Sequence, residues 1–589
     1  MENDIQEALQ GQRGDMMTYC RAEMKFIDVT ALSDATPSTN DNQSIGNIEL
    51  FEAEYLQKDY GTTELNQFVL SGEKSILPEE PEDIAFWSED QSKSDCTFED
   101  NPKLKIQFTA QHSSAGITLY FVDDYPAELV ITWYTVSGVK LISKTFYPDN
   151  LIYVCSNPVQ NYGRIEIEFV RTAYPERYVK LQYILYGKYI VWDQDMVQSG
   201  KVQEDIDVTS ATLPINKADL SIVDVNNDFD IGNEDGAWKS IQKTQEVNLA
   251  EFRDGEWIPI GAFYVDDFSF SNNIATFKLI DGVGLMDKYI FYDGQIYQNV
   301  KAGDILRSVF AAAGIMQYSI ADEVEEVMLT GYLGVQTCRK ALQRICFACG
   351  AVADDSRSDT IKVYKPDRYV SSTVGLDRKF NGHTKVALDK YVSGVSIECK
   401  RYALEEKTSD IYKGSLQAGE TRITFSEPYQ PESITATVGT IQTVKTNYLV
   451  IHMETAGECV ISGRKYANAA FAYQKNVPML EAGETENLKK FTDCTLYNAD
   501  RLPDVADSLL SYYALRQKVD MKYLEQQEQV GNWINIEALN GRSSTTLVES
   551  QSVDLTGGYI ATAKCRGYST VVTDLAYTSE FYVGERGLI

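Results

Sequence analysis

Histidine is scarce in this chain, with three among 589 residues. His112, His383 and His452 lie far apart in the sequence, so a Cys/His hydrolase would have to be assembled across separate units. Basic residues are also few, 54 against 86 acidic ones, which gives a net charge of −32. Such a chain has no general basic surface to neutralise phosphates, and high-affinity nucleic-acid binding is not expected.

Long apolar runs are absent as well. No stretch approaches the roughly 20 apolar residues needed to span a bilayer. The first residues, MENDIQEALQGQRGD, lack the basic and then apolar regions of a signal peptide. The sequence therefore predicts a protein that does not enter a membrane by itself. The ten cysteines are scattered instead of clustered, which favours a reducing compartment over a disulfide scaffold.

The aromatic content of the chain favours β-strands. It has 37 tyrosines and 23 phenylalanines, which pack well on a half-buried pleated face. Its length suggests about four domains at roughly 150 residues each. Residues 129–147 predict a hairpin, and residues 164–171 (RIEIEFVR) alternate apolar and polar side chains with the period of a half-buried strand. The spacing of strands from 98 to 187 predicts an antiparallel β-sandwich of about 100 residues.

The pattern changes twice after the sandwich. Residues 202–288 contain apolar runs separated by turn dipeptides, which predicts a small barrel or meander. Two amphipathic helices are predicted next, at 303–315 and 337–349, with Gly314 and Gly350 at the position that favours glycine after a helix. Strands then dominate to the end of the chain.

Two patterns imitate metal sites. Cys346-x-x-Cys349 lacks the second cysteine pair of a zinc site and lies on an apolar helical face, so core packing is the favoured interpretation. Asp224-x-Asn226-x-Asp228 begins like a calcium loop but lacks its glycine and its glutamate, and is interpreted as a turn-rich loop. No metal site is predicted.

Other short motifs are equally weak. Gly282-Val283-Gly284 lacks the third glycine of a dinucleotide fingerprint and is interpreted as a turn. Arg13-Gly14-Asp15 in a polar tail is attributed to chance, and no cofactor is predicted. A pair of carboxylates that hydrolyses a sugar stays possible, because the distances between the 86 acidic side chains in the folded chain cannot be derived from the sequence. The alternative for those acids is a solvated surface.

The aromatic residues of the predicted sandwich are the candidate contact residues. They are Trp133, Tyr134, Tyr147, Tyr153 and Tyr162. Such rings could stack on sugars, fill the core or pack against another subunit, and core packing with subunit contact is favoured. Because Trp133 and Tyr134 are neighbours on one strand, at most one of them points inward.

Three stretches resemble a known family. They are PINKADLSIVDVNNDF leading to WIPIGAFYVDDFSF; AGDILRSVFAAAGI followed by TGYLGVQTCRKALQRICFACGAVADDSRSDTIKVY; and GNWINIEALNGRSSTTLVESQSVDLTGGYIATAKCRGY. They resemble the baseplate or tail-tip hub proteins of tailed bacteriophages and related contractile injection systems. The first and third stretches are similar to the two barrels of that family, and the stretch between them is similar to its connecting helices and hairpin. Residues 90–190 resemble an inserted galactose-binding-type β-sandwich.

The resemblance implies a mainly β, multidomain fold with a small α+β part. The expected parts are two hub-type β-barrels, an α+β connecting module and an inserted antiparallel β-sandwich. The predicted boundaries are 1–17 for a polar tail, 18–45 for the first strands of barrel 1, 46–195 for the sandwich with an acidic loop, 196–294 for barrel 1, 295–384 for the module, and 385–589 for barrel 2 with a helix near 503–518.

The resemblance also implies a function. Family members trimerise around a channel, and two similar barrels per chain match a sixfold tail tube. The implied protein is a non-enzymatic virion component of the tail tip, made in the host cytoplasm, that joins the tail tube or distal tail protein to a spike, fibres or other baseplate proteins. DNA would only pass through the lumen of the ring. Carboxylates that line the lumen would repel the DNA phosphates and prevent the DNA from adhering. Two alternatives stay open: an adsorption protein that binds host-wall glycans through the sandwich and, less favoured, a cell-wall hydrolase.

Overall fold

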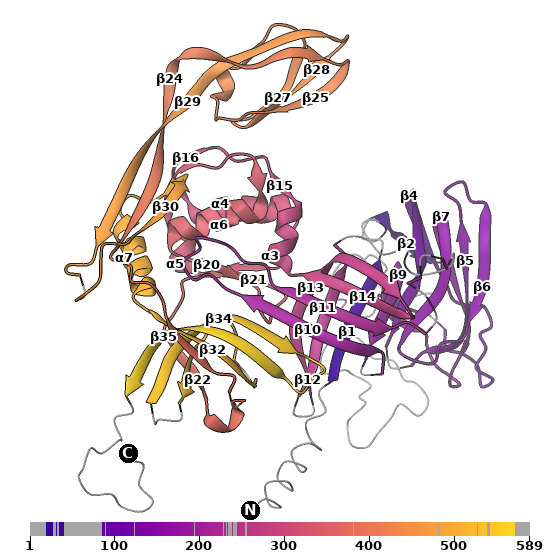
Figure 1. Ribbon diagram of the computed structural model, residues 1–589. Helices are drawn as coiled ribbons and strands as arrows, with labels where there is room; N and C mark the ends of the chain where they lie inside the picture. Colours follow the sequence, from indigo (N-terminus) through magenta and orange to yellow (C-terminus); the bar gives the residue numbers. More distant parts are fainter. Residues whose placement is uncertain are drawn as a thin grey trace, which may run out of the picture.

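The computed structural model describes residues 19–27, 31, 34–39 and 85–571, with short gaps inside the last range. β-Strands make up most of this part, and most of the helices gather in one place (Figure 1). The predicted mainly β, multidomain fold with a small α+β part is confirmed. In the described part, no helix has the length and apolar character to cross a membrane. The tail at 1–17, with Arg13-Gly14-Asp15, lies outside the described residues.

The largest element is one 13-stranded sheet, here called the frame sheet. Its first half consists of β1 (Tyr19–Ile27), β9 (Gly187–Trp192), β10 (Val197–Asp205), β11 (Lys217–Val223), β12 (Glu246–Arg253), β13 (Glu256–Ser271) and β14 (Ile274–Ile280). Its second half consists of β22 (Val370–Val374), β23 (Lys385–Leu388), β32 (Gln517–Leu524), β33 (Trp533–Glu537), β34 (Arg542–Asp554) and β35 (Ile560–Val571). The halves join where β10 pairs antiparallel with β34, from Lys201 opposite Asp554 to Asp205 opposite Ser550.

The two halves of the frame sheet share one hydrophobic core. Met24 and Val202 of the first half belong to the same buried cluster as Tyr523 and Val548 of the second half. From Gly200 to Asp205 of β10, buried residues alternate with exposed or half-buried ones, as a strand with one face on a core requires. The strands expected in two barrels therefore form one continuous curved layer.

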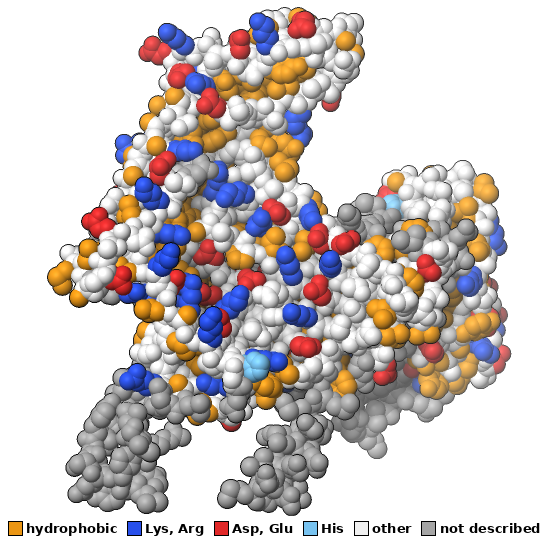
Figure 2. Space-filling model, in the orientation of Figure 1, with side chains coloured by type: hydrophobic (Ala, Val, Ile, Leu, Met, Phe, Trp, Pro, Cys, Tyr) orange, Lys and Arg blue, Asp and Glu red, His pale blue; other side chains and the backbone are white. Residues whose placement is uncertain are grey.

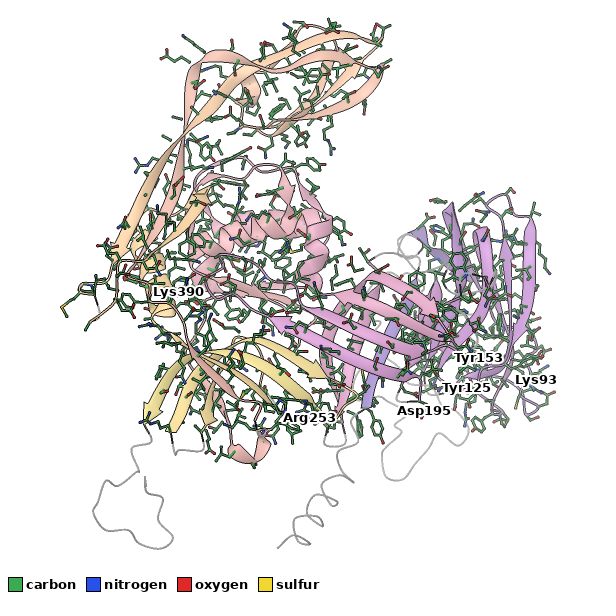
Figure 3. The ribbon with its side chains drawn as sticks, viewed as in Figure 1. Lys93, Tyr125, Tyr153, Asp195, Arg253 and Lys390 are labelled. Carbon is green, nitrogen blue, oxygen red and sulfur yellow. The ribbon has the colours of Figure 1, made fainter. Side chains whose placement is uncertain are left out.

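A buried ion cluster lies where both halves of the frame sheet meet the hairpin of β20 (Val352–Asp354) and β21 (Ile361–Tyr364). Its members are Glu204, Glu251, Arg253, Arg357 and Glu525. Arg357 Nε lies 2.7 Å from Glu204 Oε1, and Arg357 Nη1 lies 3.6 Å from Glu251 Oε1. Arg253 Nη2 lies 2.6 Å from Glu525 Oε2 and 3.2 Å from Glu251 Oε1. Figure 3 places Arg253 at the boundary between the two halves.

The inserted sandwich is a seven-stranded sheet that folds over on itself around one core. Its strands are β2 (Thr36–Thr39), β3 (Phe86–Trp87), β4 (Lys103–Phe121), β5 (Pro126–Tyr134), β6 (Lys140–Phe146), β7 (Ile152–Thr172) and β8 (Lys180–Leu185). The predicted hairpin at 129–147 is formed by β5 and β6. Long strands β4 and β7 run through both layers, and register shifts between Gln107 and Gly116 mark the bend. Gly116 is needed there, because a Cβ would lie 2.6 Å from the Cys155 carbonyl oxygen.

The α+β module packs its two main helices side by side. Its elements are α3 (Gly282–Leu285), β15 (Ile290–Phe291), β16 (Ile296–Lys301), α4 (Ala302–Ala313), β17 (Tyr318–Ile320), α5 (Asp322–Glu325), β18 (Met328–Tyr332), β19 (Gln336–Thr337), α6 (Cys338–Cys349), β20 and β21. Helices α4 and α6 are the two predicted helices, and they end at Gly314 and Gly350 with φ of 67° and 62°. Cys346 and Cys349 are buried in the module core, where burial raises the pKa of both thiols.

A long two-stranded ribbon, here called the arm, is formed by β24 (Gly394–Leu416) and β29 (Gly457–Asn476) and curves over the module (Figure 1). Its tip contains β25 (Gly419–Thr424), β26 (Thr435–Ala436), β27 (Thr440–Val444) and β28 (Tyr448–Met453), and its base contains β30 (Leu488–Cys494), β31 (Leu496–Tyr497) and α7 (Leu502–Tyr513), the helix predicted near 503–518. Asn447 fixes the tip to the module: its fully buried Nδ2 donates to the carbonyl oxygens of Gly294 at 2.6 Å and Leu333 at 3.0 Å.

The buried ion cluster leads to a first prediction. Arg357→Met should lower the free energy of unfolding by about 3–5 kcal/mol, because it leaves Glu204 buried without its closest counter-charge. Thermal unfolding of the full chain measures this. Burial already raises the pKa of Glu204 against the opposing effect of Arg357. The loss of unfolding free energy in the variant, relative to wild type, should therefore become smaller as the pH falls and the glutamates take up protons.

The control is Lys201→Met, which removes an exposed cation from the same strand, β10. Its effect should stay within about 0.5 kcal/mol. Two outcomes would contradict the inferred stabilising role of the ion cluster. One is an equal loss of unfolding free energy in both variants, and the other is a loss in Arg357→Met that does not change with pH.

Candidate functional site

The candidate contact residues of the sandwich divide into a buried and an exposed group. Trp133 and Tyr162 are both 0% exposed and belong to the sandwich core. Both rings fill the core, which is one of the alternatives left open for these aromatic residues, and neither is exposed to a ligand or a subunit in this structure. The reason is strand parity: Trp133 lies on the inner face of β5, where it packs edge-on against Phe146 with 6.5 Å between ring centres.

The other three residues reach the surface to different degrees. Tyr134 lies on the face opposite Trp133 and is half-buried under Arg164, whose guanidinium carbon is 3.9 Å from the ring centre. Tyr153 is half-buried against the core, and Figure 3 shows where it lies in the sandwich. Tyr147 is 62% exposed. The five residues therefore do not form one binding face.

The three histidines do not meet either. His112 is buried in the sandwich with Nε2 2.8 Å from Asp34 Oδ2, His383 is exposed between β22 and β23, and His452 belongs to β28 of the arm tip. Within the described ranges, no group of three or more His, Cys, Asp or Glu residues is placed to hold a metal ion. Asn226 and Asp228 of the calcium-like loop lie outside the described residues.

A buried carboxyl pair connects the end of β14 to the β20–β21 hairpin. Asp281 and Asp355 are 3% and 7% exposed and share a side-chain hydrogen bond. Asp281 accepts from the backbone N–H of Asn216 at 2.7 Å and of Gly284 at 2.6 Å, and Asp355 accepts from the N–H of Gly282 at 2.8 Å. Burial raises the pKa of Asp281 well above its ordinary value and the pKa of Asp355 to about 6.

We interpret this pair as a structural joint. Two carboxyl groups are what acid–base hydrolysis of a sugar requires, together with room for the sugar and a water. Here both groups are closed off from solvent and directed at backbone amides. Asp281 caps helix α3, so Gly282-Val283-Gly284, predicted as a turn, is a single helical turn that contacts both carboxyl groups.

The pair predicts a pH dependence. Both carboxyl groups hold protons more tightly in the folded chain than in the unfolded chain, so stability should fall as the pH rises from about 4 through 6. Asp355→Asn removes the repulsion, because its amide never ionises. Relative to wild type, the variant should gain up to about 3 kcal/mol between pH 4 and pH 7, measured by thermal unfolding.

Asp359→Asn is the matched control, since Asp359 lies in the same hairpin and is exposed. Its pH profile should follow wild type. A pH profile of Asp355→Asn that also runs parallel to wild type would show that the pair does not titrate as inferred.

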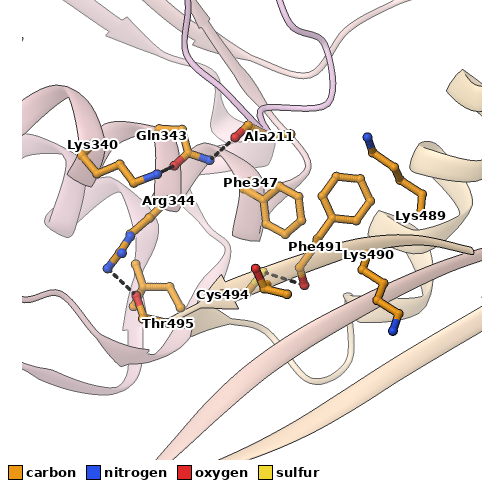
Figure 4. Close-up of a pocket in the computed structure, with 12 residues that line it drawn as sticks. Ala211, Lys340, Gln343, Arg344, Phe347, Lys489, Lys490, Phe491, Cys494 and Thr495 are labelled. Carbon is orange, nitrogen blue, oxygen red and sulfur yellow. Dashed lines mark hydrogen bonds between the residues drawn. The ribbon is translucent and has the colours of Figure 1, made fainter.

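A pocket with a basic rim lies between the module and the base of the arm (Figure 4). Its volume is about 270 Å³. Helix α6 contributes Lys340, Gln343, Arg344 and Phe347, whose spacing of three, four and seven residues from Lys340 places them on one face. The facing wall is formed by residues 489–492 and Cys494 of β30, together with Thr495 and with Leu496 at the start of β31.

Hydrogen bonds set the α6 wall of this pocket in place. Gln343 is buried, donates from Nε2 to the carbonyl oxygen of Ala211 at 3.3 Å, and accepts from Lys340 Nζ at 3.1 Å (Figure 4). Arg344 Nη1 donates to Thr495 Oγ1 at 3.2 Å. No sequence pattern predicts this pocket, because no motif connects α6 with a strand that follows it by well over a hundred residues.

Comparison with known proteins gives structural likenesses only. No protein-family model and no curated protein sequence matches the chain. Similar solved structures are a tail protein from Neisseria meningitidis (10% identity, 65% of this chain and 93% of that one, TM-score 0.38), the 43 kDa tail protein of prophage MuSo2 from Shewanella oneidensis (10%, 64% and 95%, 0.37), and prophage tail protein gp18 from Listeria monocytogenes (7%, 64% and 91%, 0.37).

All three are tail proteins, the class to which the sequence resemblance also points. Their TM-scores lie below 0.5 and their identities at 10% or less. At that distance neither a function nor the role of any residue transfers from them to this chain.

Proposed function

We propose that this chain is a structural, non-catalytic hub of a phage tail tip or baseplate, which closes as a trimer around the tail axis. It would join the tail tube or distal tail protein to the spike, fibres or other baseplate proteins. The observation that carries the proposal is the frame sheet. One continuous layer with a shared core holds the sandwich at one end and the arm at the other (Figure 1).

The edge of the frame sheet supports a contact between copies. Strand β23 ends the sheet, and all four of its residues are exposed. Val386 is 60% and Leu388 is 71% exposed. An edge strand with apolar side chains in water is a template for pairing with another chain, so it supports assembly through this edge.

The charge of the chain supports the proposed channel. A net charge of −32 favours an acidic lumen, which would repel DNA phosphates and let the genome pass without adhering. A trimer structure with a basic channel that grips DNA would contradict this part of the proposal.

The trimer can be tested by mass. Light scattering of the purified chain should give a particle near three times 66.2 kDa, and addition of its tail partners should give a heavier particle that still contains three copies of the chain. Val386→Lys combined with Leu388→Lys should shift the particle toward monomer with the fold retained by circular dichroism. Val438→Lys at the exposed arm tip is the control and should leave the mass unchanged. A monomer under all native conditions would contradict the hub proposal.

Glycan binding by the sandwich is a second candidate function, favoured by one observation. Tyr147 presents a ring that is 62% exposed, as stacking on a sugar requires. Under this hypothesis, Tyr147→Ala should weaken host-wall glycan binding by the full chain about tenfold without a change in thermal stability, because only the stacking surface is lost. Glycan arrays and titration calorimetry measure the binding.

Tyr174→Ala is the control, because Tyr174 is 56% exposed and lies in the same sandwich, just after β7, whereas Tyr147 follows β6. It should bind like wild type. Trp133→Ala is unsuitable, since it would remove a fully buried ring from the core. If the wild-type chain binds none of the host-wall glycans, the glycan-binding hypothesis is wrong, and the hub proposal is not affected.

A further inference from the structure

We propose that the basic pocket between α6 and β30 is a docking site for an acidic peptide segment of a partner protein. The inference goes beyond the hub proposal and does not depend on trimer formation. It rests on the charge of the pocket, on the strand that borders it and on the shape of its rim.

The charge of the pocket is opposite to that of the chain. In a chain with a net charge of −32, four cationic side chains line this one hollow: Lys340, Arg344, Lys489 and Lys490. Lys489 and Lys490 are exposed, and among the described side chains neither has an ion-pair partner. Figure 2 shows Lys and Arg side chains gathered between the arm and the module, where the pocket lies. Charge complementarity therefore calls for an anionic ligand.

Strand β30 gives the ligand an extended shape. In the four-stranded sheet β26–β29–β24–β30, it is the last strand and pairs with β24 alone among the described strands. Its residues 489–492 and Cys494 also line the pocket. An edge strand beside a pocket is the arrangement used in β-strand addition, in which backbone hydrogen bonds hold a peptide and side-chain pockets select its sequence.

The spread of the charges favours a peptide over a small anion. Lys489 and Lys490 are consecutive on a strand, so they extend to opposite sides of β30 and do not converge on one point (Figure 4). Several carboxylates spaced along an extended segment match that spread better than one phosphate. The rings of Phe347 and Phe491, 5.4 Å apart between their centres, provide an apolar wall for a side chain between the carboxylates. The acidity of the rest of the chain disfavours a long nucleic acid.

The test uses the full chain and a fluorescent peptide with glutamates on both sides of one phenylalanine. Fluorescence anisotropy should show binding that weakens with added salt, because the contact is mainly ionic at an exposed rim. Lys489→Glu combined with Lys490→Glu should weaken binding by about tenfold or more, because two attractive charges become repulsive. The control is Lys407→Glu combined with Lys413→Glu, two exposed lysines of β24 on the arm. It should stay within about twofold of wild type.

Competition experiments distinguish the possible ligands. Inorganic phosphate and single-stranded DNA of matched charge are used as competitors of the labelled peptide. Weak competition by both supports a peptide site. Full displacement by phosphate at low concentration, or tighter binding of the DNA, would overturn the proposal, as would equal loss of binding in the pocket and control variants.

Discussion

The burial of five charges at one junction constrains the whole fold. Glu204, Glu251 and Glu525 can leave water only if Arg253 and Arg357 leave it with them, because an unpaired buried charge costs several kcal/mol. Such a cluster adds little net stability over an apolar core, but it makes partial assembly unfavourable. Both halves of the frame sheet and the β20–β21 hairpin must therefore be in place together before all five charges are paired.

The projecting parts depend on that junction through short, polar connections. The module is tied to the frame sheet by the carboxyl pair Asp281–Asp355, and the arm returns to the module through Asn447. Because the arm is attached both at its base and at its tip, its direction is set by the module instead of by the stiffness of a two-stranded ribbon. A displacement of the module would thus move the arm with it. This mechanical continuity is consistent with the proposed function, in which the chain holds its neighbours in fixed positions.

Local pattern was enough to predict many elements but not how they combine. The period of two at 164–171 and the glycines after α4 and α6 identify a strand and two helix ends, because each signal lies within one element. The merging of two barrels into one sheet depends on the pairing of β10 with β34, which lie hundreds of residues apart. Strand parity separated Trp133 from Tyr134, but it could not say which of them faced the core. Burial of Tyr162 likewise depends on the bend shared by β4 and β7.

The basic pocket shows that the net charge of a chain predicts how it interacts with a large charged partner, but not with a short ligand. A charge of −32 acts on an extended polyanion, which meets the summed field of the surface. A short ligand meets a different field, since salt screens exposed charges beyond roughly 8 Å at physiological ionic strength. The four cations that line the pocket therefore act on such a ligand more strongly than carboxylates on remote parts of the surface. The four cations lie on two elements that are far apart in the sequence, and they form a cluster only when α6 and β30 face each other. Composition therefore argues against a general basic surface, but it carries no information about this site.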